Sequence, residues 1–213
     1  MNAVETERVR RLMDKGAPRY DRQMNFFDRV LFAGGREWAC SLAEGEVLEI
    51  AVGSGRSLEF YPEGVRLTAI EFSPEMLELA KKRAAELGRE VDLRLGDAQD
   101  LDLADESFDT IICTLALCTI PDPEKAVAEA HRVLRPGGRY VAFEHVRSPV
   151  AAVRAVERML DPLTVRFEGD HLVREPLEYL RPAGFEIEQL ERSKWGIVER
   201  VVARKAAAAS ASA

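Results

Sequence analysis

Two segments in the first half of the chain combine residue types that could bind a ligand through backbone N–H groups and a carboxylate. The turn Gly53-Ser54-Gly55 follows an apolar run, and its glycines let the backbone approach a ligand closely. Glu71 ends the next apolar run, at the spacing of a ribose-binding carboxylate in nucleotide folds. Each feature also has a purely structural explanation: the glycines could permit close packing of the turn, and the Glu71 carboxylate could face the positive end of the next helix. Together they favour a ribose bound by Glu71.

A third segment, Gly96-Asp97-Ala98, follows the next apolar run and carries a short acid. The Asp97 carboxylate could accept a hydrogen bond from the exocyclic amine of an adenine ring. An ordinary aspartate turn is the alternative. A dinucleotide is disfavoured as the ligand, because Leu58 stands where its fingerprint needs a third small residue.

Residues in the second half of the chain could move a proton. His145 comes at the end of an apolar run, where a structural hydrogen bond would explain it equally well. His171 and Asp170 lie in a glycine-containing loop that we expect before a helix, so Asp170 could simply precede that helix. A histidine or carboxylate within reach of the reacting proton is the usual general base. Cys118 is more typical of a small apolar filler than of an acceptor pocket.

The composition excludes several kinds of partner. A net charge of −7 over 213 residues is unsuited to nucleic acid, which needs a basic face. The three cysteines are odd in number and form no CxxC pair, so neither a disulfide framework nor a metal site is predicted. The N-terminus lacks an apolar signal core, and no run approaches the ~18 apolar residues of a membrane span. We therefore expect a cytoplasmic protein that acts on a small molecule.

These residues must be positioned by a fold in which strands alternate with helices. Seven apolar runs predict strands, at 46–51, 66–71, 91–95, 108–113, 138–145, 185–190 and 197–203. The last two strands have no helix between them, which indicates an antiparallel hairpin at one edge. The alternation elsewhere predicts an α/β fold, with a mostly parallel seven-stranded sheet covered on both faces.

Helix signals stand between the runs. Ser73-Pro74-Glu75 and Asp122-Pro123-Glu124 each combine an N-cap, a proline and an acid. The first helix should end near Gly88 and the second at Pro136-Gly137-Gly138. Residues 4–15 and 20–42 are expected to form two helices ahead of the sheet. The chain then divides into a helical cap at 1–45, a main domain at 46–205 and an Ala/Ser tail at 206–213 that we expect to be disordered.

Five motifs, in this order, resemble the class I S-adenosylmethionine-dependent methyltransferases. They read Glu49…Gly53-Ser54-Gly55, Glu71-Phe72-Ser73, Gly96-Asp97-Ala98, Ser107-Phe108-Asp109 and Leu134-Arg135-Pro136-Gly137-Gly138. The resemblance spans roughly residues 20 to 146 and is greatest to the branch with the ubiquinone and menaquinone biosynthesis methyltransferases. It implies a three-layer Rossmann-like methyltransferase fold, S-adenosylmethionine as cofactor, and methyl transfer as the reaction.

The resemblance also implies which residues would surround the methionine end of the cofactor. Those that would shape it are Glu49, Ala51, Gly53, Ser54 and Gly55. Ala51 departs from the family pattern, which has glycine there, so we expect a slightly shifted methionine pocket. Thr114 and Leu115 would lie beneath the sulfonium and its methyl group. Tyr20, with Asp21, resembles the start of the segment that covers the cofactor in many relatives.

The same resemblance assigns the nucleoside end. Glu71 would hold the ribose, in agreement with its spacing from the glycine turn. Phe72 and Met76 would line the adenine, while Asp97 and Ala98 would contact its edge.

Two shorter resemblances concern the acceptor and leave three functions open. Segments between Tyr20 and Leu77 are similar to soluble bacterial phosphatidylethanolamine N-methyltransferases, and Gly169–Glu175 is similar to proteins that methylate alkyl thiols. The first function is methyl transfer to a small lipophilic thiol, hydroxyl or amine, with His145, His171 and Asp170 as candidate catalytic residues. The second is phospholipid N-methylation, with membrane docking through the N-terminal helices. The third is a cofactor-binding module without catalysis, for which Ala51 is the argument.

Overall fold

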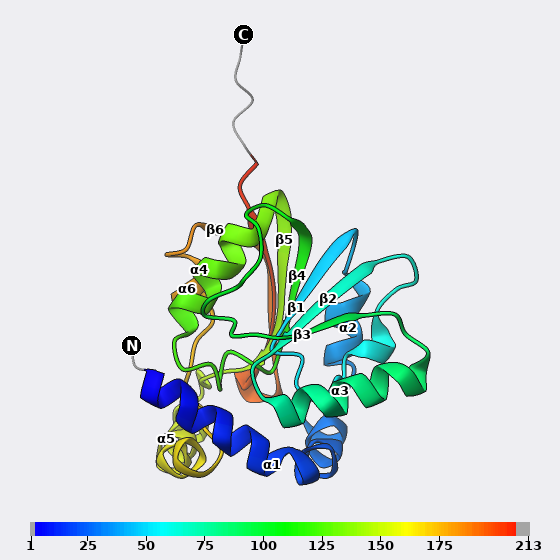
Figure 1. Cartoon of the computed structure of the whole chain (residues 1–213). Coiled ribbons are helices and arrows are strands. Elements are labelled where there is room, and N and C mark those ends of the chain that lie inside the picture. Colours follow the sequence, from blue (N-terminus) through cyan, green and yellow to red (C-terminus); the bar gives the residue numbers. More distant parts are fainter. Residues whose placement is uncertain (1–2, 208–213) are drawn as a thin grey trace.

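The computed structural model describes residues 3–207 and is built on one seven-stranded sheet (Figure 1). The strand order is β3-β2-β1-β4-β5-β7-β6, in which β7 runs in the opposite direction to the other six strands. The strands are β1 Glu46–Ile50, β2 Arg66–Glu71, β3 Asp92–Leu95, β4 Phe108–Thr114, β5 Leu134–His145, β6 Phe185–Ser193 and β7 Val198–Lys205. The sheet confirms the predicted fold class, with its hairpin of β6 and β7 at one edge. Residues 208–213 of the expected tail lie outside the described part of the chain.

Within residues 3–207, six α-helices accompany the sheet, which has a core on each face. They are α1 Ala3–Val30, α2 Gly35–Ser41, α3 Pro74–Leu87, α4 Pro123–Val133, α5 Ala151–Phe167 and α6 Leu177–Leu180. Successive strand residues face opposite sides. In β1, Val47 accordingly packs in a cluster with residues of α2 and α3, whereas Leu48 packs in a cluster with residues of α4 and α6. Because both faces of the sheet are covered, the central strands β1 and β4 are buried over nearly their whole length, whereas the edge strand β6 is mostly exposed.

Local signals place the two helices that follow β2 and β4. The Ser73 hydroxyl caps α3 by accepting a hydrogen bond from the Met76 N–H, and Gly88 ends the helix in a left-handed conformation at φ 62°. Asp122 caps α4 in the same way. However, α4 ends at Val133, and Pro136-Gly137-Gly138 lies inside β5 instead of closing the helix as predicted. The glycines here serve the start of a strand.

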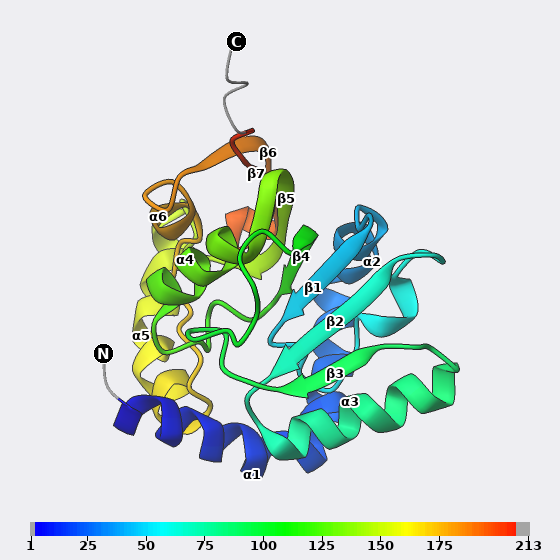
Figure 2. The same ribbon diagram turned by 45° about the horizontal axis from the view of Figure 1, so that its top comes forward.

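The helix α1 runs without interruption from Ala3 to Val30, so the prediction of a break between residues 15 and 20 was wrong. Tertiary contacts hold α1 across Pro18, because Asp14 accepts a hydrogen bond from Ser73 and Asp21 accepts one from Ser54. These partners follow β2 and β1, so α1 crosses the carboxyl ends of the strands (Figure 2). The predicted second helix is split after Val30, and its latter part, α2, belongs to the core.

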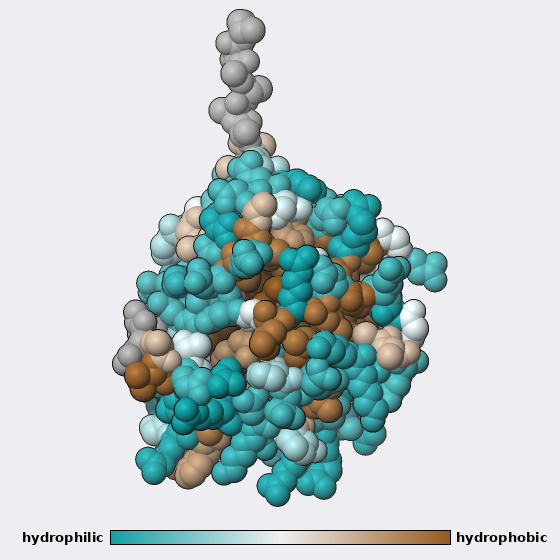
Figure 3. Space-filling model, in the orientation of Figure 1, coloured by the Kyte–Doolittle hydropathy of each residue, from teal (hydrophilic) through white to brown (hydrophobic). Residues whose placement is uncertain are grey.

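The region after β5 also differs from the prediction. A helix, α5, precedes the Gly169-Asp170-His171 loop, whereas we expected a helix to follow it. The next helix, α6, starts only at Leu177, so Asp170 does not precede a helix start. Residues 96–107, between β3 and β4, form no helix. In the view of Figure 3, which has the orientation of Figure 1, apolar side chains gather over the sheet between α3 and α4.

Candidate active site

The turn after β1 uses its two glycines for different purposes. Both are left-handed, Gly53 at φ 59° and Gly55 at φ 77°. A Cβ on Gly55 would lie 3.1 Å from the Ala80 Cα, so this glycine lets the turn pack against α3. A Cβ on Gly53 would meet nothing within 4 Å, so Gly53 borders open space. That open side is where a ligand could approach the backbone.

Ala51 takes a backbone conformation that glycine adopts more easily. Its φ is 52°, in the left-handed region where a Cβ costs roughly 1–2 kcal/mol. It lines a pocket with Phe72, Asp97 and Ala98, which are the residues expected around the adenine. Ala51 thus borders the pocket of the residues expected around the adenine, and the expectation of a slightly shifted methionine pocket stays a prediction. Backbone geometry gives a physical reason for glycine here in the family.

Glu71 joins the ends of β1 and β2. Its carboxylate is 3% exposed and accepts hydrogen bonds from the N–H groups of Gly53 and Ser73, both at 2.9 Å. Burial raises its pKa to about 7, although the backbone donors favour the charged form. The hydroxyl of Ser73, and not Glu71, caps α3. Glu71 is thus held at the glycine turn, where its oxygens could accept from a ribose.

The pocket that Ala51 lines, the candidate nucleoside pocket, is built from three carboxyl-end loops. Phe72 follows β2, Asp97 and Ala98 follow β3, and Ile120 with Pro121 follows β4. The Asp97 carboxylate accepts hydrogen bonds from both the backbone and the side-chain nitrogen of Gln99, which fix its orientation. Met76 is 2% exposed and does not line the pocket in this structure, and its contact with the adenine stays a prediction.

Glu49 supports the glycine turn from behind. Its buried carboxylate accepts hydrogen bonds from the hydroxyls of Ser57 and, at 3.0 Å, Tyr61. Both belong to the segment that leaves the turn and includes the 3₁₀ helix Leu58–Phe60. Burial raises the pKa of Glu49 to about 7. It would therefore shape the methionine end by holding the loop.

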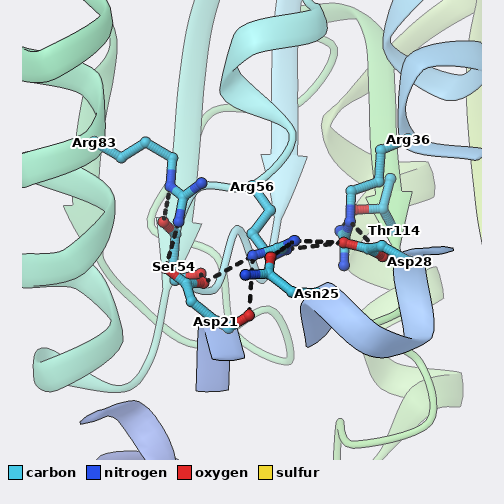
Figure 4. A network of polar contacts seen from close by, with 8 residues as sticks. All are labelled: Asp21, Asn25, Asp28, Arg36, Ser54, Arg56, Arg83 and Thr114. Carbon is cyan, nitrogen blue, oxygen red and sulfur yellow. Dashed lines mark hydrogen bonds and ion pairs between the residues drawn. The ribbon is translucent and has the colours of Figure 1, made fainter. Parts of the chain in front are cut away.

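A polar network ties α1 to the glycine turn (Figure 4). The Ser54 hydroxyl donates to Asp21 at 2.6 Å, and Arg83 donates to both Asp21 and the Ser54 carbonyl. Arg56 donates to a set of α1 side chains, Asp21, Asn25 and Asp28. Ser54 therefore holds α1 at the turn, directly through its hydroxyl and indirectly through Arg83, which bridges its carbonyl to Asp21. Tyr20, next to Asp21, lies partly buried on the same helix, and burial raises its pKa.

Arg36 is a buried cation that the sequence analysis missed. It lies on α2, is 8% exposed, and donates from Nη1 to the Thr114 hydroxyl at 2.9 Å. Asp28 is a distant ion partner at 3.9 Å, and within the described residues Nε has no hydrogen-bond partner. Buried donors are nearly always satisfied, so this unpaired guanidinium nitrogen, beside an equally unpaired Oδ1 of Asp28, could donate to an anionic group. A charged residue on the otherwise apolar side of α2 was the only signal in the sequence.

His145 and Asp170 form a pair at the end of β5. The Nε2 atom of His145 lies 3.1 Å from Oδ1 of Asp170, and both side chains are largely buried. Burial alone would lower the pKa of His145, but the Asp170 carboxylate outweighs it and raises the pKa. Burial likewise opposes ionisation of Asp170, yet His145 lowers its pKa. The Cys118 sulfur completes the cluster, whose three donor atoms lie within 4.8 Å of one another.

Thr114 ends β4 and Leu115 begins the loop that follows, between the candidate nucleoside pocket and the His145–Asp170 pair. Leu115 is left-handed at φ 52°, and the following N–H groups of Ala116 and Leu117 donate to the buried Glu144. Burial raises the pKa of Glu144 to about 7. Glu144 thus holds the loop from the end of β5, directly beside His145.

His171 is separate from the pair. Its backbone N–H donates to the Cys118 carbonyl at 3.0 Å, which ties the loop after α5 to the loop after β4. Its half-buried ring lines a groove with Glu5, Arg174 and Tyr179. This groove shares Thr119 and Pro121 with the nucleoside pocket, so the two are neighbours.

Known proteins place this site in a family. Residues 48–142 match the family model described as a methyltransferase domain. The chain is 41% identical to a phosphatidylethanolamine N-methyltransferase of Cereibacter sphaeroides over 59% of this chain and 61% of that protein. It is 32% identical to a thiol S-methyltransferase of Homo sapiens over 86% of this chain and 79% of that protein.

A solved structure supports the same fold. A methyltransferase from Thermotoga maritima superimposes with a TM-score of 0.71 at 24% identity, covering 92% of this chain and 99% of that one. The motifs, the glycine turn beside Glu71 and these relatives agree with one another. The chain therefore belongs to the methyltransferase-domain family and is an S-adenosylmethionine-dependent methyltransferase.

Proposed function

We propose that this enzyme methylates a small lipophilic acceptor at a thiol, hydroxyl or amine, with His145 as general base and Asp170 as the residue that positions it. The observation that carries the proposal is the 3.1 Å pair at the end of β5, beside the loop of Thr114 and Leu115. A buried base next to the expected methyl position is what an acceptor that must lose a proton requires.

S-adenosylmethionine supplies an electrophilic methyl group on a sulfonium. The residues that would hold it are those with open or unsatisfied groups on its side of the sheet. Gly53 borders open space, Glu71 can accept from the ribose, and Asp97 lies at the adenine pocket. Arg36, whose Nε is unpaired, would bind the α-carboxylate of the methionine moiety. The residues present therefore fit this cofactor.

The chain's own groups would then align and deprotonate the acceptor. Because Nε2 of His145 faces Asp170, Nδ1 is the nitrogen that would take the proton from the acceptor. Asp170 would hold the ring and stabilise the imidazolium that forms. Since only the neutral ring can accept a proton, turnover should rise with pH through the raised pKa of His145. His171, in the adjoining groove, would contact the acceptor without joining the pair.

Among acceptors, a thiol is supported best. The thiol S-methyltransferase aligns with 86% of this chain, whereas the phospholipid enzyme aligns with 59%. The test is a screen of alkyl thiols, phenols, amines and phosphatidylethanolamine vesicles with methyl-labelled donor, followed by identification of the product. We expect label on a thiol, and much less with His145→Ala. Turnover that is unaffected by His145→Ala on every accepted substrate would contradict the assigned base.

Phosphatidylethanolamine N-methylation is the second candidate. It is supported by the 41% identity to the Cereibacter sphaeroides enzyme and by exposed Phe26, Phe27 and Val30 at the end of α1, which could contact a membrane. No helix among residues 3–207 is long and apolar enough to cross a bilayer. Label found on the phospholipid amine alone would favour this candidate over the thiol.

The role of Arg36 can be tested by the donor alone. Wild type should bind S-adenosylmethionine more tightly than its decarboxylated analogue, by roughly the 1.5–3 kcal/mol of a charged hydrogen bond. Arg36→Met should lose this preference, whereas Arg29→Met, at an exposed position in α1, should keep it. Calorimetry measures both affinities. A preference that survives in Arg36→Met would show that another group binds the carboxylate.

A further inference from the structure

The helix α5 turns its apolar side outward. Of its residues, all of which the structure describes, Glu157 alone is buried. The exposed apolar residues are Val156, Met159, Leu160, Leu163 and Phe167, with Met159 68% and Phe167 64% exposed. Their spacing of three and four places them on one face. A helix of a globular protein normally buries such a face.

Polar contacts hold the opposite side of α5 to the molecule. Glu157 accepts a hydrogen bond from the Ser148 N–H at 2.9 Å, and Asp161 accepts one from the Leu172 N–H at 2.8 Å. The Val165 carbonyl accepts one from Arg8 of α1. The orientation of α5 is therefore fixed by specific hydrogen bonds, and its apolar face is left for another surface.

Trp195 is a further exposed apolar residue beside the start of α5. It is 71% exposed and left-handed at φ 60°, a backbone conformation that is strained for a bulky residue. The Ser148 hydroxyl donates to its carbonyl at 2.6 Å, and the next residue, Gly196, lies directly against Pro149. The turn is thereby held beside the N-terminus of α5. An exposed tryptophan is typical of a membrane interface.

The charges on α5 point to the kind of surface that it meets. Its two acids, Glu157 and Asp161, face the molecule through the hydrogen bonds above, whereas Arg158 and Arg166 are exposed. Lys194 adds a cation beside Trp195. These cations are notable on a chain of net charge −7. Apolar residues flanked by exposed cations are the pattern of helices that lie in an anionic membrane interface.

We propose that the apolar face of α5, together with Trp195, is the surface by which this enzyme docks on an anionic lipid bilayer. The chain continues from α5 into Gly169-Asp170-His171, so the surface adjoins the groove and the His145–Asp170 pair. A lipophilic acceptor dissolved in the bilayer would then reach the site without crossing water. This surface consists of α5 and Trp195, so binding to a bilayer can be measured without turnover. Only the delivery of the acceptor rests on the proposed function.

The test is flotation of the full chain with vesicles. Wild type should float with phosphatidylglycerol–phosphatidylcholine vesicles, and at least tenfold less with phosphatidylcholine alone or at high salt. The double variant Met159→Glu/Leu163→Glu should lower the floating fraction at least tenfold. The control Leu87→Glu, which changes an exposed apolar residue of α3, should not lower it. Arg158→Glu/Arg166→Glu should abolish the preference for anionic vesicles. Thermal unfolding of each variant confirms that the exposed substitutions leave the fold intact.

Three outcomes would overturn the proposal. Wild type that stays at the bottom of the gradient with anionic vesicles has no such surface. Flotation that is lost with Phe26→Glu/Phe27→Glu but kept with Met159→Glu/Leu163→Glu assigns the contact to α1 instead. A wild-type dimer that does not float, and that Met159→Glu/Leu163→Glu converts to a monomer in size-exclusion chromatography, assigns the α5 face to a second copy of the chain.

Discussion

The site has two parts that were built in different ways. The part at the ends of β1, β2 and β3 holds the glycine turn, Glu71 and Asp97, each of which directly follows its strand. The part at the end of β5 depends on a residue from a distant segment, since His145 meets Asp170 beyond α5. The candidate cofactor residues that follow β1, β2 and β3 are therefore encoded locally, whereas the proposed base pair and the proposed carboxylate ligand Arg36 are brought into place by tertiary packing.

The largest effect should come from closing the open side of the cofactor part. Gly53→Arg should abolish binding of S-adenosylmethionine, because the side chain would occupy the space beside the turn. Gly64→Arg is the matched control, since Gly64 is also left-handed with nothing within 4 Å, but lies in the turn before β2. Calorimetry should show no binding for the first variant and wild-type binding for the second. Equal binding by both would place the cofactor elsewhere.

The acceptor part should respond in turnover instead. His145→Ala should lower kcat by about 10²–10⁴, the usual contribution of a general base, and leave donor affinity nearly unchanged. His171→Ala should lower turnover less, because its ring lines the groove outside the pair. Steady-state kinetics with the donor and acceptor varied in turn separates these effects. A donor affinity that falls as much as kcat would mean that the two parts are not independent.

The pH dependence of donor binding should report on Glu71. Its pKa is raised to about 7 and only the ionised carboxylate accepts from both ribose hydroxyls, so affinity should fall as pH drops below about 7. Glu71→Gln should weaken binding by ~1–3 kcal/mol at pH 8 and reduce this dependence. Binding isotherms from pH 6 to pH 8 measure the difference between the two proteins. If both show the same pH dependence, Glu49 or Glu144 is the titrating group.

The smallest effect should be that of Ala51→Gly. Removing the Cβ from a left-handed residue should raise the free energy of unfolding by about 1 kcal/mol, less the entropy that glycine adds to the unfolded chain. Donor binding should be retained, because the pocket only gains space. Chemical denaturation measures the stability change. A destabilised variant would show that the Ala51 methyl group packs usefully in the pocket.

Much of the cofactor part could be predicted because its signals are short-range. The cap Ser73, the following proline and Gly88 predicted where α3 begins and ends. The acid that ends β2, Glu71, was identified from its spacing to the glycine turn. Which side chains line the pocket could not be predicted, because this depends on the angle between turn and helix: Ala51 lines it, whereas Met76 is buried away from it. The continuous α1 was missed because contacts from three loops outweigh the local effect of Pro18.

The sequence by itself determined the strand–helix alternation, the family and the cofactor, because each is encoded in the hydrophobic period and turn chemistry of a contiguous segment. Only the tertiary structure decided that Asp170 pairs with His145, that Arg36 lies buried beside Thr114, and that α5 turns its apolar side outward. These features join residues tens of positions apart, and their geometry follows from strand order and helix packing, which no local pattern specifies.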